Sequence, residues 1–184
     1  MRGLEQSDLA AHVGKGHTVR NLVLVPVVLT LTTQLGGVVM AQSNIGITES
    51  RNKAIVEASF NAWRDGTGSP FDLLTNDATW TIVGRSVVAK TYENRDEFMR
   101  DVIRPFNARM REPLKPVIRR IYTDGDAVIV FFDARGTARD GKPYVNTYAW
   151  LLEMRDERVV AASAFFDSLE LNELWARVAP ATPE

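Results

Sequence analysis

Apolar and polar residues alternate through the second half of the chain, a pattern typical of half-buried strands. The runs are Leu114–Thr123, Asp126–Arg139, Tyr144–Met154 and Arg158–Phe166. The first three are separated by Asp124-Gly125 and Asp140-Gly141, dipeptides that favour hairpin turns. The pattern therefore predicts a long antiparallel meander in this half.

The first half instead carries apolar residues at helical spacing. Residues Glu49–Trp63 place Ile55, Val56 and Phe60 on one broad face, and Thr48 is suited to cap such a helix. We therefore expect a helix from Glu49 that buries this face.

Shorter elements follow this helix. Ser69-Pro70 starts a short helix, and Asn94 caps another over Arg95–Arg104, which Pro105 is expected to stop. The remaining expected elements are strands at Ala78–Val83 and Ser86–Tyr92 and a final helix from Ser168 to Arg177. The order of elements predicts an α+β fold, with a cone-shaped, curved antiparallel sheet wrapped around the N-terminal helices and a pocket inside.

The N-terminal segment has the pattern of a secretory signal. A weakly basic start precedes a short apolar run, and the small residues Val39 and Ala41 precede Gln42. We expect residues 1–41 to be a signal peptide, 42–48 a linker, 49–178 the domain and 179–184 a disordered tail. The expected location is periplasmic or secreted. The alternatives are an uncleaved anchor at Leu22–Met40 and a buried helix.

Composition narrows the possible chemistry. The 184 residues carry a net charge of −1 and no cysteine, and the two histidines, His12 and His17, lie in the expected signal. The mature chain would then have no thiol or imidazole, which excludes Ser-His, Cys-His and zinc-His mechanisms. We expect no cofactor, no metal and no nucleic-acid partner.

The second hairpin predicts which strand residues share a face. If Asp140-Gly141 is a two-residue turn, Arg139 lies opposite Lys142. Counting back along both strands pairs Arg135 with Asn146, Asp133 with Tyr148 and Phe131 with Trp150. These six side chains would face the pocket. The other face, which includes Val128 and Leu151, is also apolar and is a candidate surface for a partner subunit.

Asp133 is the candidate catalytic residue on the predicted pocket face. Aromatic surroundings would raise the pKa of its carboxyl, which suits a general acid or base, while Tyr148 and Asn146 would polarise a ligand oxygen. The alternative is a structural role, in which Asp133 pairs with Arg135, Arg119 or Tyr148. The expected ligand-binding residues are Trp63, Trp80, Ile82, Phe131, Arg135, Trp150, Ala164 and Phe166. The tryptophans would serve equally well as core residues without a ligand.

One segment is strongly basic. Its cations are Arg104, Arg109, Arg111, Lys115, Arg119 and Arg120, opposed only by Glu112. Such a run is typical of a solvated face, and the alternative is attraction of an anionic ligand or a lipid surface.

Three stretches resemble one known family: NKAIVEASFNAW from Asn52, LLTNDATW ending at Trp80, and GKPYVNTYAWLLEMRDERVVAASAFFD ending at Asp167. On these stretches residues 52–178 resemble the SnoaL-like branch of the nuclear transport factor 2-like superfamily. The resemblance implies an α+β cone with an interior pocket, commonly in a homodimer. The family includes polyketide cyclases, ketosteroid isomerases, limonene epoxide hydrolases and scaffold subunits.

The residue sets of two of these enzyme classes are incomplete here. Of the epoxide hydrolase set, the resemblance keeps Asp133, but Phe131 and Ala164 stand where an Arg and an Asp are expected. Trp80 and Ile82 replace its Tyr and Asn, and this strand also lacks the base Asp of ketosteroid isomerases. Asp167 matches an acidic position of the family, or else caps the last helix.

These observations favour an exported SnoaL-like protein whose aromatic pocket binds a small, mostly apolar organic molecule. If it is an enzyme, the expected chemistry is of isomerase, cyclase or lyase type, with proton transfer through Asp133. The alternatives are a non-catalytic ligand-binding protein and a dimeric envelope scaffold. The expected partners are the small molecule and a second copy of the chain, with membrane contact only if the N-terminal segment is uncleaved.

Overall fold

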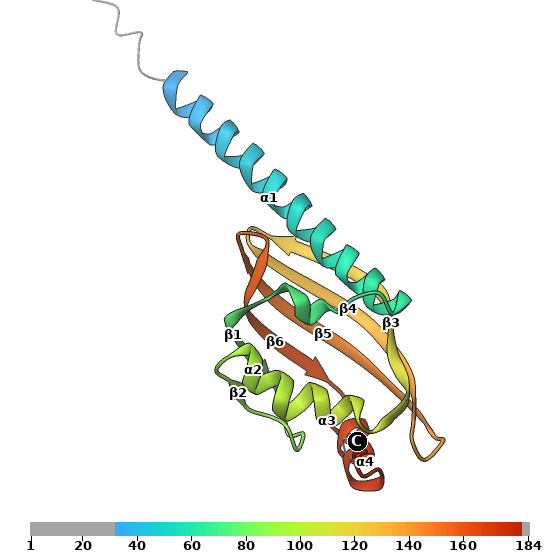
Figure 1. Cartoon of the computed structure of the whole chain (residues 1–184). Coiled ribbons are helices and arrows are strands. Elements are labelled where there is room, and N and C mark those ends of the chain that lie inside the picture. The colour runs from blue at the N-terminus through green and yellow to red at the C-terminus, as the bar shows by residue number, and fades with distance from the viewer. Residues whose placement is uncertain (1–31, 182–184) are drawn as a thin grey trace, which may run out of the picture.

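The computed structural model describes residues 32–181, in which a curved six-stranded sheet is covered on one side by helices (Figure 1). The helical elements are α1 (Thr32–Asp65), the 3-10 turn η1 (Pro70–Leu73), α2 (Arg95–Phe98), the π-helical turn η2 (Met99–Ile103), α3 (Arg104–Asn107) and α4 (Ser168–Arg177). The strands are β1 (Leu74–Ile82), β2 (Thr91–Tyr92), β3 (Met110–Asp124), β4 (Ala127–Ala138), β5 (Pro143–Arg155) and β6 (Arg158–Phe166).

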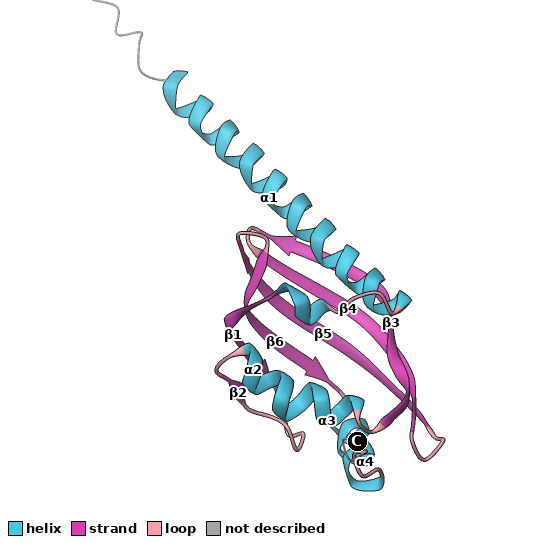
Figure 2. Cartoon of the chain, viewed as in Figure 1, coloured by secondary structure: helices cyan, strands magenta, loops and turns pink. Residues whose placement is uncertain are grey.

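The strand order is β2-β1-β6-β5-β4-β3. Strands β3 to β6 form the predicted antiparallel meander, and β2 pairs antiparallel with β1. The pairing of β1 with β6 is parallel, which the sequence pattern did not predict. Figure 2 shows α1, α2 and α3 together on one side of this sheet, which we call the inner face. The α+β prediction, with a curved sheet around N-terminal helices, is thus confirmed.

Helix α1 is held by one buried stripe. Asn52, Val56 and Phe60 lie one turn apart and are at most 4% exposed, because the sheet curves around them. The helix begins well before Glu49, so residues 42–48 are helical and Thr48 is not a cap. The predicted cap at Thr48 was wrong, since no proline interrupts residues 32–65 and the helix runs through this position. None of the helices among residues 32–181 is long and apolar enough to cross a membrane.

The expected signal peptide at residues 1–41 lies largely outside the described residues. So does most of the alternative anchor at Leu22–Met40. The last three residues of the expected tail, 182–184, are likewise outside them.

The second helical segment is longer than predicted. Asn94 caps it as expected, since its side-chain oxygen accepts a hydrogen bond from the Glu97 amide at 2.8 Å. Pro105 does not end it, and the helix continues through Asn107. The π-helical turn η2 ends at Ile103, two residues before Pro105. A wider turn accommodates a residue that has no N–H to donate, so the helix passes through the proline.

The turn between β4 and β5 differs from the prediction by one residue. The Ala138 amide donates to the Lys142 carbonyl at 2.9 Å, and Gly141 adopts φ +86°. The loop therefore has three residues rather than two, closed by a glycine in the left-handed region. The length of this loop sets the pairing of β4 with β5, so Asp133 lies opposite Thr147 and Phe132 lies opposite Tyr148.

This one-residue shift turns the predicted pocket face of β4 outward. Phe131, Asp133 and Arg135 lie on the outer face of the sheet. Asn146, Tyr148 and Trp150 lie on the inner face, where they meet the buried β4 residues that we expected on the opposite side. Those residues are Val128, Val130, Phe132 and Ala134, each at most 2% exposed.

Candidate functional site

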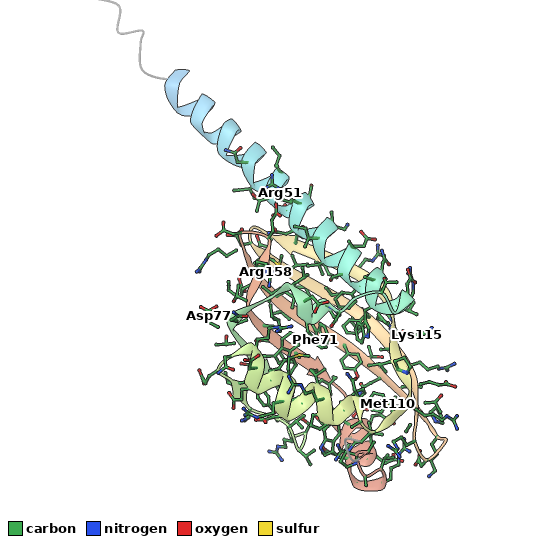
Figure 3. The ribbon with its side chains drawn as sticks, in the orientation of Figure 1. Arg51, Phe71, Asp77, Met110, Lys115 and Arg158 are labelled. Atoms are coloured by element: carbon green, nitrogen blue, oxygen red, sulfur yellow. The ribbon has the colours of Figure 1, made fainter. Side chains whose placement is uncertain are left out.

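A cavity of about 620 Å³ lies between the inner face and the helices, a size typical of small-molecule sites. Of the residues that the sequence analysis expected at a ligand site, the structure places seven in the wall of this cavity. They are Trp63, Trp80, Ile82, Tyr148, Trp150, Ala164 and Phe166. Figure 3 labels Phe71, which also lines the cavity and lies over the middle of the sheet.

Stacked and edge-on rings form the cavity wall. Trp80 stacks on Phe98 with ring centroids 4.5 Å apart, and it meets Trp150 edge-on at 5.0 Å. Trp150 in turn lies nearly parallel to Trp63 at 6.0 Å. Such contacts hold flat apolar surfaces in place, which suits a planar ligand.

The sequence analysis missed the helical side of this wall. Phe98, Val102 and Phe106 line the cavity and are all buried. Their spacing of four residues is the signal that would have identified them, since it places them on one helix face. Because the helix was expected to end at Arg104, Phe106 was not recognised as part of this stripe.

Tyr148 is the polar group that β5 places in the wall. Its hydroxyl lies 3.1 Å from the hydroxyl of Tyr144, which accepts a hydrogen bond from the Asn146 side-chain amide at 3.0 Å. If Tyr144 donates to Tyr148, both hydroxyls of the pair are used and the Tyr148 hydrogen is left to donate into the cavity. The opposite direction would leave the buried Tyr144 hydrogen without a partner among the described residues, which costs free energy.

Burial keeps both hydroxyls protonated. Loss of solvent raises the pKa of Tyr148 well above its usual value, and the neighbouring Tyr144 raises it further. Burial also raises the pKa of Tyr144, against the lowering effect of the hydrogen bond that it accepts from Asn146. Tyr148 is therefore a neutral hydrogen-bond donor at any ordinary pH.

Asn146 has a structural role, not the predicted contact with a ligand. Its side-chain amide donates to the Tyr144 hydroxyl and to the Asp167 carbonyl, both at 3.0 Å. Its side-chain oxygen accepts from the amides of Asp167 and Thr147. Both amide hydrogens are thus used, so Asn146 orients Tyr144 and ties β5 to the end of β6.

Asp133 lies on the opposite face of the sheet from the cavity. Its carboxylate accepts hydrogen bonds from Arg119 at 2.6 Å and from Thr147 at 2.7 Å. These bonds, with Thr147 the larger influence, lower the pKa of Asp133 below its usual value. The expected aromatic pocket, which would have raised that pKa, is on the other side of β4. The structural ion pair with Arg119 is therefore the interpretation that the geometry supports.

Two other expectations differ from the structure, and one alternative is confirmed. Phe131 and Arg135 lie on the outer face with Asp133 and do not line the cavity. Asp167 caps α4, because its side-chain oxygen accepts from the Leu169 amide at 2.9 Å. This confirms the capping alternative of the sequence analysis, and the backbone of Asp167 is held by Asn146.

The cavity opens between the end of α1, the end of α3 and the start of β3. We call this opening the mouth, and it consists of Gly66, Gly68, Ser69, Asn107, Arg111, Pro113 and Lys115. The described residues that line the cavity and its mouth include no Asp, Glu or His. No group of three metal-ligating side chains occurs within residues 32–181.

Comparisons with known proteins agree on the family and the fold of this chain. Residues 56–162 match the family model of the SnoaL-like domain, whereas curated proteins gave no match. Among solved structures, Bal32a from a soil-derived mobile gene cassette is 22% identical, with a TM-score of 0.58 over 70% of this chain and 98% of that one.

Two further structures are similar. TerC, co-crystallised with polyporic acid, is 19% identical, with a TM-score of 0.55 over 67% of this chain and 97% of that one. A protein from Jannaschia sp. CCS1, described as SnoaL-like and polyketide cyclase-like, is 17% identical, with a TM-score of 0.54 over 73% and 95%. At these identities the likeness concerns the fold.

Proposed function

Because the chain belongs to the SnoaL-like family, whose model matches more than half of it, we propose that it binds a small, planar, mostly apolar organic molecule inside its cone. The ligand carries an oxygen that accepts a hydrogen bond from Tyr148. The co-crystal of TerC with polyporic acid supports an organic ligand on this fold.

One observation carries the proposal: an aromatic cavity of about 620 Å³ whose wall includes the buried Tyr148, with its hydroxyl 3.1 Å from that of Tyr144. The rings supply apolar contact area. The Tyr148 hydroxyl orients the ligand, because a buried donor without an acceptor costs about 1–3 kcal/mol. A ligand oxygen at this point removes that cost.

Binding of 2-naphthalenemethanol tests the proposal. Its rings match the wall and its hydroxyl is neutral, and quenching of tryptophan fluorescence reports its arrival. Ala164 is 2% exposed and lines the cavity, so Ala164→Phe fills the space. Ser163→Phe is the matched control, because Ser163 is the neighbouring residue on the other face of β6.

We expect binding in the wild type and in Ser163→Phe, and its loss in Ala164→Phe, with unchanged circular dichroism in all three. Binding that persists in a folded Ala164→Phe would contradict the location. Failure of the wild type to bind this alcohol and its anionic analogue 2-naphthoate would contradict the function.

Proton transfer by Asp133 is not part of this proposal. The carboxylate is on the far side of the sheet, and Tyr148 supplies the hydroxyl in the buried part of the wall among the described residues. An isomerase or cyclase would need a base as well as this donor. The non-catalytic alternative of the sequence analysis therefore has the better support.

A second proposal concerns the outer face, which we assign to a second copy of the chain. Exposed apolar side chains gather there from three strands: Val117, Tyr122, Val145, Leu151 and Phe165, each between 37% and 64% exposed. Monomers rarely leave such a patch on one face of a sheet in water.

Light scattering coupled to size exclusion tests this homodimer. We expect a dimer for the wild type and a monomer for Phe165→Asp, because a charge at 44% exposure enters the centre of the interface. Arg85→Asp, at an exposed loop position outside the sheet, is the control and should remain dimeric. A monomeric wild type at micromolar concentration would contradict the proposal.

Export is a third proposal, and it depends on the N-terminal pattern alone. The test is the intact mass of the full-length protein made in an exporting host. A mature chain that starts at Gln42 supports a cleaved signal. A membrane-bound chain that retains Leu22–Met40 supports the anchor instead.

A further inference from the structure

The structure separates the basic residues between 104 and 120 into different roles. Arg109 is 8% exposed and lies over the ring of Trp175 at 4.2 Å. Arg119 is paired with Asp133 on the outer face. Arg111 and Lys115, by contrast, lie at the mouth of the cavity. Arg109 and Arg119 thus have structural roles, whereas Arg111 and Lys115 border the proposed ligand site.

A local irregularity of β3 brings Arg111 to the mouth. The register with β4 shifts between Met110 and Glu112 and again before Lys115, so Arg111 lies within a bulge. Gly136 on β4 lets this bulge approach closely: a Cβ there would lie 2.9 Å from the Glu112 carbonyl oxygen. Because the bulge crosses the inner face at Gly136, the start of the strand reaches the rim of the cavity.

Lys115 reaches the same rim from the edge of the sheet. It lies opposite Arg135 in the β3–β4 ladder and also borders the cavity. Figure 3 labels Met110 and Lys115 along this side of the molecule. We therefore expect Lys115 to contribute less than Arg111, which lies in the bulge itself.

Neither cation is neutralised within the described part of the chain. No carboxylate lies within 4.0 Å of Arg111 or Lys115 among residues 32–181. Glu112, the acidic neighbour in sequence, instead accepts a hydrogen bond from Thr137. The mouth is therefore locally positive although the whole chain carries a net charge of −1.

The positive charge continues along the seam between α1 and β3. A second hollow of about 420 Å³ follows this seam, and it includes Lys53 and Arg120 with Glu57 as its acidic residue. A cleft bordered by one sign of charge attracts ligands of the opposite sign and raises their rate of association.

We propose that the ligand of the cavity is an organic acid. Its planar apolar body lies against the aromatic wall, and its anionic group lies at the mouth beside Arg111 and Lys115. This inference rests on the proposed function, since it names the class of ligand for that cavity. A neutral ligand would leave both cations without a partner, and a cationic one would be repelled.

Three probes with the same ring system but different charges test whether the ligand is an anion. They are 2-naphthoate, 2-naphthalenemethanol and 2-naphthylmethylammonium, titrated against the full-length chain at pH 7 by calorimetry. We expect the affinities to fall in that order, with about tenfold between the acid and the alcohol. The advantage of the acid should shrink between 20 and 500 mM salt, because added ions screen an exposed charge.

Substitutions at the mouth test whether Arg111 and Lys115 bind the anionic group. Arg111→Gln should lower the affinity for 2-naphthoate about tenfold and Lys115→Gln about threefold, with the affinity for the alcohol unchanged. Arg139→Gln is the matched control, because Arg139 is exposed in the β4–β5 loop and has no side-chain partner within the described residues.

The outcomes separate the two proposals. If the alcohol and the acid bind equally well, or if the acid keeps its advantage in Arg111→Gln and Lys115→Gln combined, the assignment of an acidic ligand is wrong while the cavity remains a binding site. If no probe binds, the proposed function fails as well. An equal loss in Arg139→Gln would attribute the effect to the overall charge and would also overturn the assignment.

Discussion

The two faces of the sheet are built from alternate residues of the same strands, yet they carry opposite chemistry. The inner face presents rings and one buried hydroxyl to a cavity, and no carboxylate lines that cavity among the described residues. The outer face presents exposed apolar side chains around the Arg119–Asp133–Thr147 cluster. The comparison indicates that ligand binding and association belong to separate faces, 180° apart along each strand.

Neighbouring residues on β5 give the strongest test of this separation. Trp150 is 5% exposed and contacts the rings of Phe60, Trp80 and Phe132, whereas Leu151 is 37% exposed on the outer face. Trp150→Ala should lower the free energy of unfolding by about 3–5 kcal/mol. Leu151→Ala should cost less than about 1 kcal/mol in the monomer. Urea denaturation at low protein concentration measures both, and equal losses would contradict the assignment of faces.

The second test uses alkaline pH, which acts on the inner face. The folded-state pKa of Tyr148 is raised, so its contribution to stability is complete below pH 10 and is lost as the pH rises further. Urea midpoints between pH 8 and 12 should therefore fall steeply above pH 10. Tyr148→Phe should flatten this fall. Part of the fall will remain, because burial also raises the pKa of Tyr92, to about 12. An unchanged slope in the variant would exclude Tyr148 as its source.

The third test removes the hydroxyl that we assign to the ligand. Tyr148→Phe keeps the ring, which stacks on Phe132 with centroids 4.8 Å apart, and so it should keep the fold. We expect the affinity for 2-naphthalenemethanol to drop about fivefold, the value of one hydrogen bond. Naphthalene, which has no oxygen, is the control probe and should bind both proteins alike. A similar loss for naphthalene would indicate a change of shape rather than a lost hydrogen bond.

The smallest expected effect is on the outer face. Asp133→Asn should change the free energy of unfolding by less than about 1 kcal/mol at pH 7, because the ion pair with Arg119 is half-exposed. Its lowered pKa means that its contribution is present above pH 4 and is lost as the pH falls, so the variant should lose less stability in acid. Binding of 2-naphthoate should not change. A large loss of binding would indicate that Asp133 contributes to the ligand site after all.

Sequence patterns predicted the fold and part of the cavity lining for identifiable reasons. Strand alternation and Asp-Gly turns predicted the meander, and six of the expected ligand-binding residues and Tyr148 line the cavity. The faces of β4 were wrong because the loop before Lys142 has three residues, and one residue in a loop exchanges the two faces of a strand. Arg111 could not have been placed, since its position depends on a bulge that follows from contact with Gly136.

The tryptophan side chains allow the most direct test of the central claim, that the inner-face cavity is the ligand site. Trp63, Trp80 and Trp150 line the cavity, whereas Trp175 lies on α4 against Arg109 and does not. Titration of ¹⁵N-labelled protein with 2-naphthoate, followed through the indole N–H signals, should shift the three cavity signals together and leave that of Trp175 in place. Three unmoved cavity signals at saturating 2-naphthoate, or a shift confined to Trp175, would contradict the account.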